Sequence, residues 1–160
     1  MKNENTSERE IVISKVVDAP RELVFKAWTE LEHLKNWWGP NGFSTKTEHF
    51  EFRIGGEWIF LMIGPDGHEF PNEIYFENII PPELIEYEHG GGDEVGVNDA
   101  AFHATITFEE QGEKTLITMK SLFLTKKQRD HVVEKYGAIE GGKQHLASLE
   151  EYVKLINSNE

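Results

Sequence analysis

The sequence predicts an α+β fold: a curved antiparallel sheet of about seven strands wrapped around a long C-terminal helix, with two short helices after the first strand. Three observations lead to this prediction. A β-branched segment occupies residues 11–17, strand-like segments separated by short turns fill residues 43–123, and an amphipathic stretch follows at 138–157. Short turns join antiparallel neighbours, because parallel strands need crossovers of roughly a dozen or more residues. The apolar face of such a sheet must be covered, and the last helix can cover it.

The chain begins with a polar segment and a first strand. Residues 1–9 predict a disordered tail, and residues 10–157 predict a single domain, since no linker or repeat interrupts them. Residues 11–17 are apolar at five of seven positions and rich in β-branched side chains, which favours a strand. Asp18-Ala19-Pro20 ends that strand, because proline is favoured in a first helical turn and an acid suits the positive end of a helix.

Two short helices are predicted next. Apolar residues from Leu23 to Leu31 recur at spacings of three and four, as on the buried face of a helix. A second short helix is predicted from Leu34 to Trp37-Trp38. Gly39-Pro40-Asn41-Gly42 then ends it, because glycine and proline interrupt helices.

The middle of the chain predicts six further strands. Turn signals such as Gly55-Gly56 and Pro81-Pro82 separate them. Alternation is clearest in the last of them, where Ile117, Met119 and Phe123 share one face. The predicted strands are residues 43–53, 56–63, 68–79, 83–89, 100–110 and 114–123.

Two helices follow the sheet. Residues 125–128 have the form of a capping box and predict the start of a helix that ends by Tyr136-Gly137. The longer helix, 138–157, has large aliphatic residues along the second half of its apolar stripe and Gly141-Gly142 in the first half. Each glycine inside a helix costs about 0.5–1 kcal/mol relative to alanine. We expect these small residues to leave space for a ligand between helix and sheet; alternatively they let the sheet backbone approach, or they break the helix.

Composition excludes several classes of protein. The 160 residues carry 16 Lys and Arg against 29 Asp and Glu, and the resulting net charge of −13 repels phosphate backbones and anionic lipid heads. We therefore expect no nucleic-acid partner. No apolar run approaches the roughly 20 residues that span a bilayer, so we expect no membrane insertion. Cysteine is absent, which excludes disulfides and thiol chemistry, and the first residues show no apolar signal segment, so the expected location is cytoplasmic.

A series of short motifs runs through most of the chain, from about residue 10 to residue 156. The motifs are Asp18-Ala19-Pro20-Arg21-Glu22-Leu23-Val24-Phe25-Lys26-Ala27-Trp28, Trp37-Trp38-Gly39-Pro40, Arg53-Ile54-Gly55-Gly56-Glu57-Trp58, Asp66-Gly67, Pro81-Pro82-Glu83-Leu84, Thr115-Leu116-Ile117-Thr118-Met119 and Tyr136-Gly137-Ala138-Ile139-Glu140-Gly141-Gly142. In this order they resemble the helix-grip fold of the START-like (SRPBCC) superfamily. Within it they are most similar to the branch named after the activator of heat-shock-protein-90 ATPase homologue.

The resemblance implies a cavity between the curved sheet and the long helix. Members of the superfamily bind lipids, sterols, plant phenolics or polyketides, some cyclise or dehydrate polyketides, and some bind other proteins. We expect binding of a small hydrophobic or aromatic metabolite or lipid without catalysis. A polyketide cyclase- or dehydratase-like enzyme and a chaperone-ATPase-activator-like interaction module are the alternatives. The co-chaperones of this branch carry an additional N-terminal domain, whereas about nine residues precede the first predicted strand here, so a chaperone partner is not expected. A homodimer is left open.

The candidate ligand contacts are aromatic, small and polar residues predicted to border the space between helix and sheet. A packed core explains most of the aromatic residues equally well. His145 is the one candidate for catalysis, because a neutral imidazole four residues after Gly141 could bind a ligand carbonyl or move a proton; the alternative is a histidine that faces water. Tyr87 and His103 could also orient a ligand. The candidates are Trp38, Trp58, Phe60, Phe76, Tyr87, Phe102, Phe123, Tyr136, Gly141, Gly142 and His145.

No metal site or cofactor is expected. The seven histidines contain no pair at helical i, i+4 spacing, and surface histidines beside acids are the expected arrangement. Residues 90–99 are glycine-rich at their start and predict a loop at the mouth of the cavity. Four acids on predicted strands could point inward, but the alternation there does not fix their orientation. They are Glu48, Glu57, Glu73 and Glu77.

Overall fold

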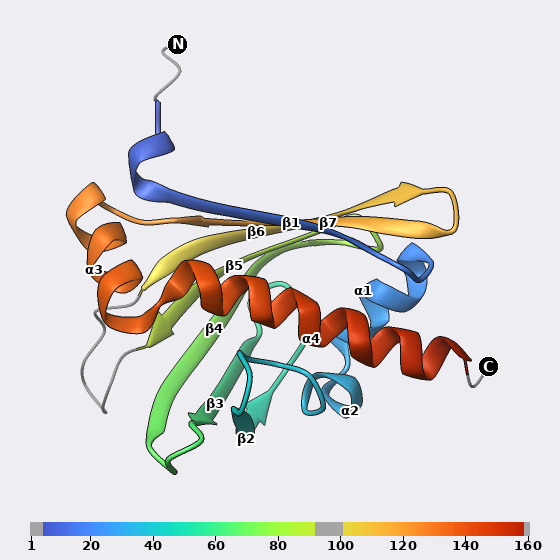
Figure 1. Ribbon diagram of the computed structural model, residues 1–160, viewed down its shortest axis with the longest axis horizontal. Coiled ribbons are helices and arrows are strands. Elements are labelled where there is room, and N and C mark those ends of the chain that lie inside the picture. The colour runs from blue at the N-terminus through green and yellow to red at the C-terminus, as the bar shows by residue number, and fades with distance from the viewer. Residues whose placement is uncertain (1–4, 92–100, 159–160) are drawn as a thin grey trace.

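The computed structural model describes residues 5–91 and 101–158. In chain order its elements are η1 (Ser7–Arg9), β1 (Glu10–Val17), α1 (Arg21–Thr29), α2 (Leu31–Leu34), β2 (Ser44–Phe50), β3 (Glu57–Ile63), β4 (Glu69–Ile80), β5 (Leu84–Gly91), β6 (Phe102–Gln111), β7 (Lys114–Leu122), α3 (Lys126–Tyr136) and α4 (Ala138–Ser158). The seven strands form one antiparallel sheet in the order β1-β7-β6-β5-β4-β3-β2. The sheet curves around α4, with α3 at one end and α1 and α2 at the other (Figure 1), so the predicted fold class is confirmed.

The first residues and the second helix differ from the sequence predictions. η1 lies within the segment predicted to be a disordered tail, and its last residue, Arg9, donates a hydrogen bond from Nη1 to the carbonyl of Phe123 at 2.8 Å. α2 ends at Leu34, so Trp37 and Trp38 lie after it rather than in it. Tertiary contacts hold this segment: the Trp37 indole donates to the Ala27 carbonyl at 3.0 Å, which fixes a turn where the local pattern favoured a helix.

The inner face of the sheet carries most of the core. Aromatic side chains of α1 and of the segment after α2 pack against those of β3 and β6; the ring centroids of Trp38 and Trp58, for example, are 4.9 Å apart. The outer face carries the charge. Glu48, Glu57, Glu73 and Glu77 are all exposed, so none of these strand acids points into the core. Residues 92–100, which include most of the predicted mouth loop, lie outside the described residues.

The two helices after the sheet have the predicted features: capping residues at both ends of α3 and an apolar face along α4. The Thr125 hydroxyl accepts a hydrogen bond from the Gln128 backbone N–H at 3.0 Å, and the αL residue Gly137, with φ 61°, ends α3. α4 then runs unbroken, and its second half buries Leu146, Leu149 and Val153 against the sheet. Among the described residues, no helix combines the length and the hydrophobicity needed to cross a membrane.

Candidate ligand-binding site

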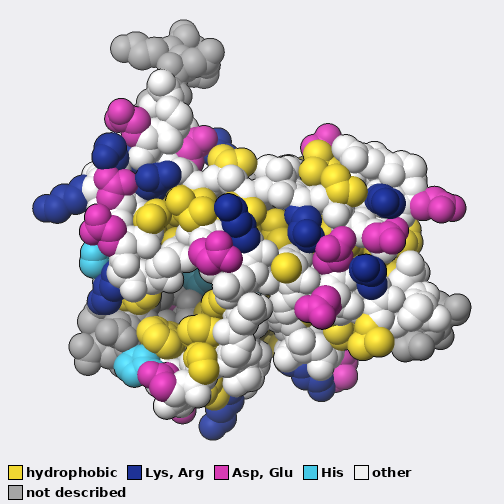
Figure 2. Space-filling model, in the orientation of Figure 1, with side chains coloured by type: hydrophobic (Ala, Val, Ile, Leu, Met, Phe, Trp, Pro, Cys, Tyr) yellow, Lys and Arg dark blue, Asp and Glu magenta, His cyan; other side chains and the backbone are white. Residues whose placement is uncertain are grey.

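A cavity of about 260 Å³ lies between the first half of α4 and the inner face of the sheet. Small residues line both of its walls. In the sheet, Ala104 on β6 lies directly between Tyr87 on β5 and Ser121 on β7, so two adjacent positions of the inner face carry little side chain. In the helix, Ala138 and Gly141 face the same space. The cavity opens on the face drawn in Figure 2, as a recess beside the first turns of α4 in which a histidine side chain is visible.

The two glycines of α4 have different neighbours. A methyl group on Gly141 would meet nothing within 4 Å, so this residue borders open space. A methyl group on Gly142 would overlap Cδ1 of Ile13 on β1, so this residue makes room for a side chain of the sheet. Of the explanations offered by the sequence, open space fits Gly141. Close approach of the sheet backbone fits neither glycine, because the atoms nearest to a methyl group on Gly142 belong to the side chains of Ile13 and Met119. Helix breakage fits neither, because α4 is continuous through both.

His145 lies one turn after Gly141 and lines the same cavity. Its Nδ1 accepts a hydrogen bond from the Gly39 backbone N–H at 3.0 Å, so the neutral ring carries its proton on Nε2. The rings of Trp37 and Trp38 lie 4.9 and 4.5 Å from it, centroid to centroid. Burial, with a smaller contribution from the nearby His89, lowers the pKa of His145 to about 3. The alternative that His145 faces water is therefore wrong, and its imidazole is neutral near pH 7.

Hydrogen bonds fix the segment after α2 to α4. Besides the bond from Gly39, Ser148 Oγ donates to the Trp37 carbonyl at 2.8 Å, and the Asn41 N–H donates to Gln144 Oε1 at 3.0 Å. Gly39 has a φ of 102°, a conformation that favours glycine. This backbone path points its N–H at the histidine, so the segment and the helix together set the orientation of the ring.

β5 contributes two more polar side chains to the cavity. Tyr87 and His89 are two residues apart and therefore share the inner face. The Asn72 amide donates from Nδ2 to the Phe70 carbonyl at 3.0 Å, so its oxygen, Oδ1, faces His89. His89 Nε2 therefore carries the proton and donates to Asn72 Oδ1 at 2.8 Å. His89 Nδ1 therefore keeps its lone pair. Burial lowers the pKa of His89 to about 4, and burial raises the pKa of Tyr87, so both side chains are uncharged near pH 7.

Most of the residues that the sequence marked as ligand contacts line this cavity. They are Trp38, Tyr87, Phe102, Phe123, Tyr136, Gly141, Gly142 and His145. Trp58, Phe60 and Phe76 do not line it and instead belong to the packed core beside it. The sequence analysis missed other lining residues. They include Ile13, Asn72, His89 and Ser121. Ser121 and His89 share strand parity with predicted inward residues, which is the signal that could have identified them.

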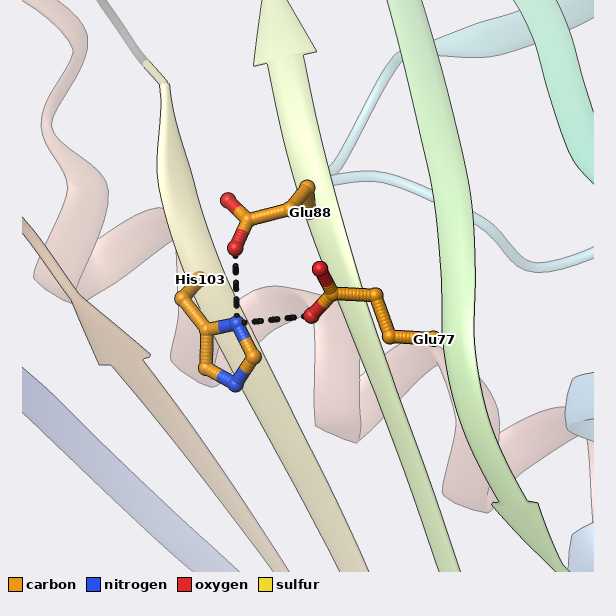
Figure 3. A group of neighbouring side chains, drawn as sticks. All are labelled: Glu77, Glu88 and His103. Atoms are coloured by element: carbon orange, nitrogen blue, oxygen red, sulfur yellow. Dashed lines mark hydrogen bonds and ion pairs between the residues drawn. The ribbon is translucent and has the colours of Figure 1, made fainter. Parts of the chain in front are cut away.

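A second polar cluster lies on the outer face of the sheet, away from the cavity (Figure 3). His103 Nδ1 lies 2.9 Å from Glu88 Oε1 and 3.2 Å from Glu77 Oε1, and its Nε2 lies 3.2 Å from Glu86 Oε2. Burial opposes the charged ring, but the hydrogen bonds to Glu88 and Glu86 and the charges of Glu88 and Glu77 outweigh it, so the pKa of His103 is raised. The expectation that His103 orients a ligand in the cavity is therefore wrong.

The residues of this outer cluster are the ones that could hold a metal ion. Glu77, Glu88 and His103 each offer a ligand atom, and these atoms lie within 4.8 Å of one another. Carboxylates face both ring nitrogens, however, which favours the protonated ring and raises its pKa. A metal ion would have to displace a proton from the ring nitrogen that it binds. The arrangement as it stands is a charge-paired cluster on the surface of the sheet.

A cavity between a curved antiparallel sheet and a long terminal helix is characteristic of the START-like (SRPBCC) superfamily, and the chain has this fold. A family model described as "Activator of Hsp90 ATPase homolog 1-like protein" matches residues 18–154. The chain therefore belongs to this family. Among proteins of curated function, none matches the chain.

Solved structures from several bacteria have the same fold. A protein from Arthrobacter aurescens is 26% identical, with a TM-score of 0.86 over 95% of this chain and 90% of its own. A protein from Nitrosomonas europaea is 24% identical, with a TM-score of 0.80 over 96% of this chain and 99% of its own. The AHSA1 protein from Silicibacter pomeroyi is 19% identical, with a TM-score of 0.76 over 91% and 98% of the two chains. These similarities support the fold and leave the function to be argued from the cavity.

Proposed function

We propose that this protein binds a small, largely apolar molecule in the cavity between α4 and the sheet. The observation that carries the proposal is the open space bordered by Gly141 and Ala104, since α4 packs closely on the sheet one turn further along, at Leu146. Protein interiors are close-packed, and unfilled apolar space inside one costs stability. A bound molecule of matching shape would recover those contacts.

The size and lining of the cavity favour a compact ligand. Its volume of about 260 Å³ is slightly smaller than that of common ligand sites, which measure roughly 300–1,000 Å³. Aromatic walls from Trp38, Phe102, Phe123 and Tyr136 suit a flat molecule. A single ring system or a short chain fits this space better than a lipid with two acyl chains.

The protonation states favour binding over catalysis of the cyclase or dehydratase type. His145 cannot act as a general base, because its only lone pair accepts the Gly39 N–H. His89 keeps a lone pair on Nδ1, but a pKa of about 4 makes it a weak base near pH 7. A chaperone-activating role stays a prediction of the family resemblance alone.

The proposal is tested by filling the cavity from the helix side. Gly141→Leu adds a side chain where no atom lies within 4 Å, and it replaces a glycine inside a helix. The variant should therefore fold with an unfolding midpoint at or above that of the parent protein. Naphthalene should raise the midpoint of the parent and have no effect on the variant. Ala147→Leu, at an exposed position of the same helix, is the matched control and should respond to naphthalene like the parent.

Two results would contradict the proposal. One is a naphthalene response in Gly141→Leu equal to that of the control variant, which would place the binding site elsewhere. The other is no response in the parent protein to naphthalene at its solubility limit. Amide chemical shifts of Ala104 and Ser121 provide a second measurement, because both residues lie on the sheet side of the cavity.

A further inference from the structure

We infer that the ligand carries one uncharged hydroxyl group, which hydrogen-bonds to Tyr87, His89 and His145 in a largely apolar cavity. The inference rests on the proposed function and adds to it the chemical class of the ligand. It follows from three polar atoms that line the cavity without partners and from the absence of any charged group beside them.

The unpartnered atoms come from both walls. Tyr87 is only 4% exposed, and within the part of the chain that the structure describes its hydroxyl has no hydrogen-bond partner. His145 has Nδ1 occupied by the Gly39 N–H, which leaves Nε2–H as a donor. His89 has Nε2 occupied by Asn72, which leaves Nδ1 as an acceptor. Among the described residues, none of these three atoms is fully enclosed, so each is accessible from the cavity. A ligand that fills the cavity covers them, and each polar atom that it leaves without a hydrogen bond costs roughly 1–3 kcal/mol.

A hydroxyl group matches this set of atoms. It can accept hydrogen bonds on its two lone pairs from the Tyr87 hydroxyl and from His145 Nε2–H, and it can donate its proton to His89 Nδ1. A carbonyl oxygen could satisfy the two donors but would leave His89 Nδ1 without a proton to accept. A hydrocarbon would satisfy none of the three atoms.

The cavity does not suit a charged group. Among the lining residues within 5–91 and 101–158 there is no Lys, Arg, Asp or Glu. The two histidines are held neutral, so they supply no counter-charge for an anion such as a carboxylate. Transfer of an unpaired charge from water into an apolar site is strongly unfavourable. The site should therefore select an alcohol or phenol over the corresponding acid.

The test compares three probes that share one ring system: naphthalene, 2-naphthol and 2-naphthoate, measured at pH 7.5 by titration calorimetry or by fluorescence. We expect 2-naphthol to bind about tenfold more tightly than naphthalene, and 2-naphthoate to bind at least tenfold more weakly than 2-naphthol. Tyr87→Phe removes one donor without changing the ring. It should weaken 2-naphthol binding about three- to tenfold and leave naphthalene binding unchanged.

The controls separate this inference from the proposed function. Tyr75→Phe removes a hydroxyl from the exposed side of the neighbouring strand and should alter no affinity. The unfolding midpoint of ligand-free Tyr87→Phe should not fall, since the hydroxyl that it removes has no partner there. Equal affinity for naphthalene and 2-naphthol, both lost in Gly141→Leu, would overturn the inference and leave the proposed function standing. Tightest binding by 2-naphthoate would do the same, whereas no binding by any probe would overturn both.

Discussion

Substitution of the two neighbouring glycines of α4 by alanine should have different effects on stability. Both changes gain about 0.5–1 kcal/mol, because alanine is the better helix former. At Gly141 the new methyl group meets no atom within 4 Å, so the whole gain should appear. At Gly142 the methyl group would overlap Cδ1 of Ile13, the far end of a flexible side chain that borders the cavity, so a change of its rotamer, costing about 0.5–1.5 kcal/mol, can relieve the overlap. We expect Gly142→Ala to be about 0.5–1.5 kcal/mol less stable than Gly141→Ala.

Urea unfolding measures this difference, because both variants should share the parent m-value and differ only in midpoint. Ile13→Val supplies the critical control, since it removes the Cδ1 atom that the new methyl would strike. In a double-mutant cycle, Gly142→Ala should cost less in the Ile13→Val background than in the parent, whereas Gly141→Ala should show no such coupling. Equal stability of the two alanine variants, or coupling at Gly141 instead, would refute the assignment of one glycine to the cavity and the other to the contact.

Three further outcomes are expected. Because the folded protein holds the pKa of His89 near 4 and that of His145 near 3, the unfolded state takes up protons first as pH falls below 6.5. These two histidines should add no pH dependence at higher pH, and the free energy of unfolding measured with urea should fall by roughly 2 kcal/mol per histidine towards pH 5. A midpoint independent of pH over this window would contradict the burial of these rings. For His103 the pH dependence of stability has the opposite sign, because its pKa is raised in the folded protein. Its contribution to the free energy of unfolding is complete below pH 6.5 and is lost as pH rises through the raised pKa, so His103→Gln should cost about 1 kcal/mol at pH 6 and less at pH 9. Thr125→Ala removes the acceptor for the Gln128 N–H and should cost about 1 kcal/mol in thermal or urea unfolding, against no change for Thr125→Ser.

Local signals in the sequence were sufficient where neighbouring residues determine the structure. The start of α3 was predicted from residues 125–128, because the cap and the amide that it accepts are three positions apart. The first strand was predicted from its β-branched residues, and the six later strands because glycine and proline turns separate them. The second short helix was wrongly extended to Trp37 for the converse reason. The hydrogen-bond partners of Trp37, Ala27 and Ser148, lie on other helices, and a local pattern does not show which distant residues a segment contacts.

The cavity was only half predictable. Its helix wall followed from the cost of glycine in a helix, which drew attention to Gly141. Its sheet wall depends on the register that places Ala104 beside Ser121, and no short segment of sequence fixes that register. The environment of His89 depends on Asn72, 17 residues away on the adjacent strand, so the sequence alone gave no reason to separate it from surface histidines.

The strand order has a consequence for how the protein folds. Every strand pair joins neighbours in the chain except β1 and β7, where Glu10 lies opposite Leu122 (Figure 1). Closing a loop on the order of a hundred residues is entropically costly, so hairpins from β2 to β7 should form before β1 docks and α4 can settle on it. The cavity would then not yet be formed in the rate-limiting transition state for folding. A ligand that binds the cavity in the native state but not in the transition state should slow unfolding and leave the refolding rate unchanged, which stopped-flow measurements can record.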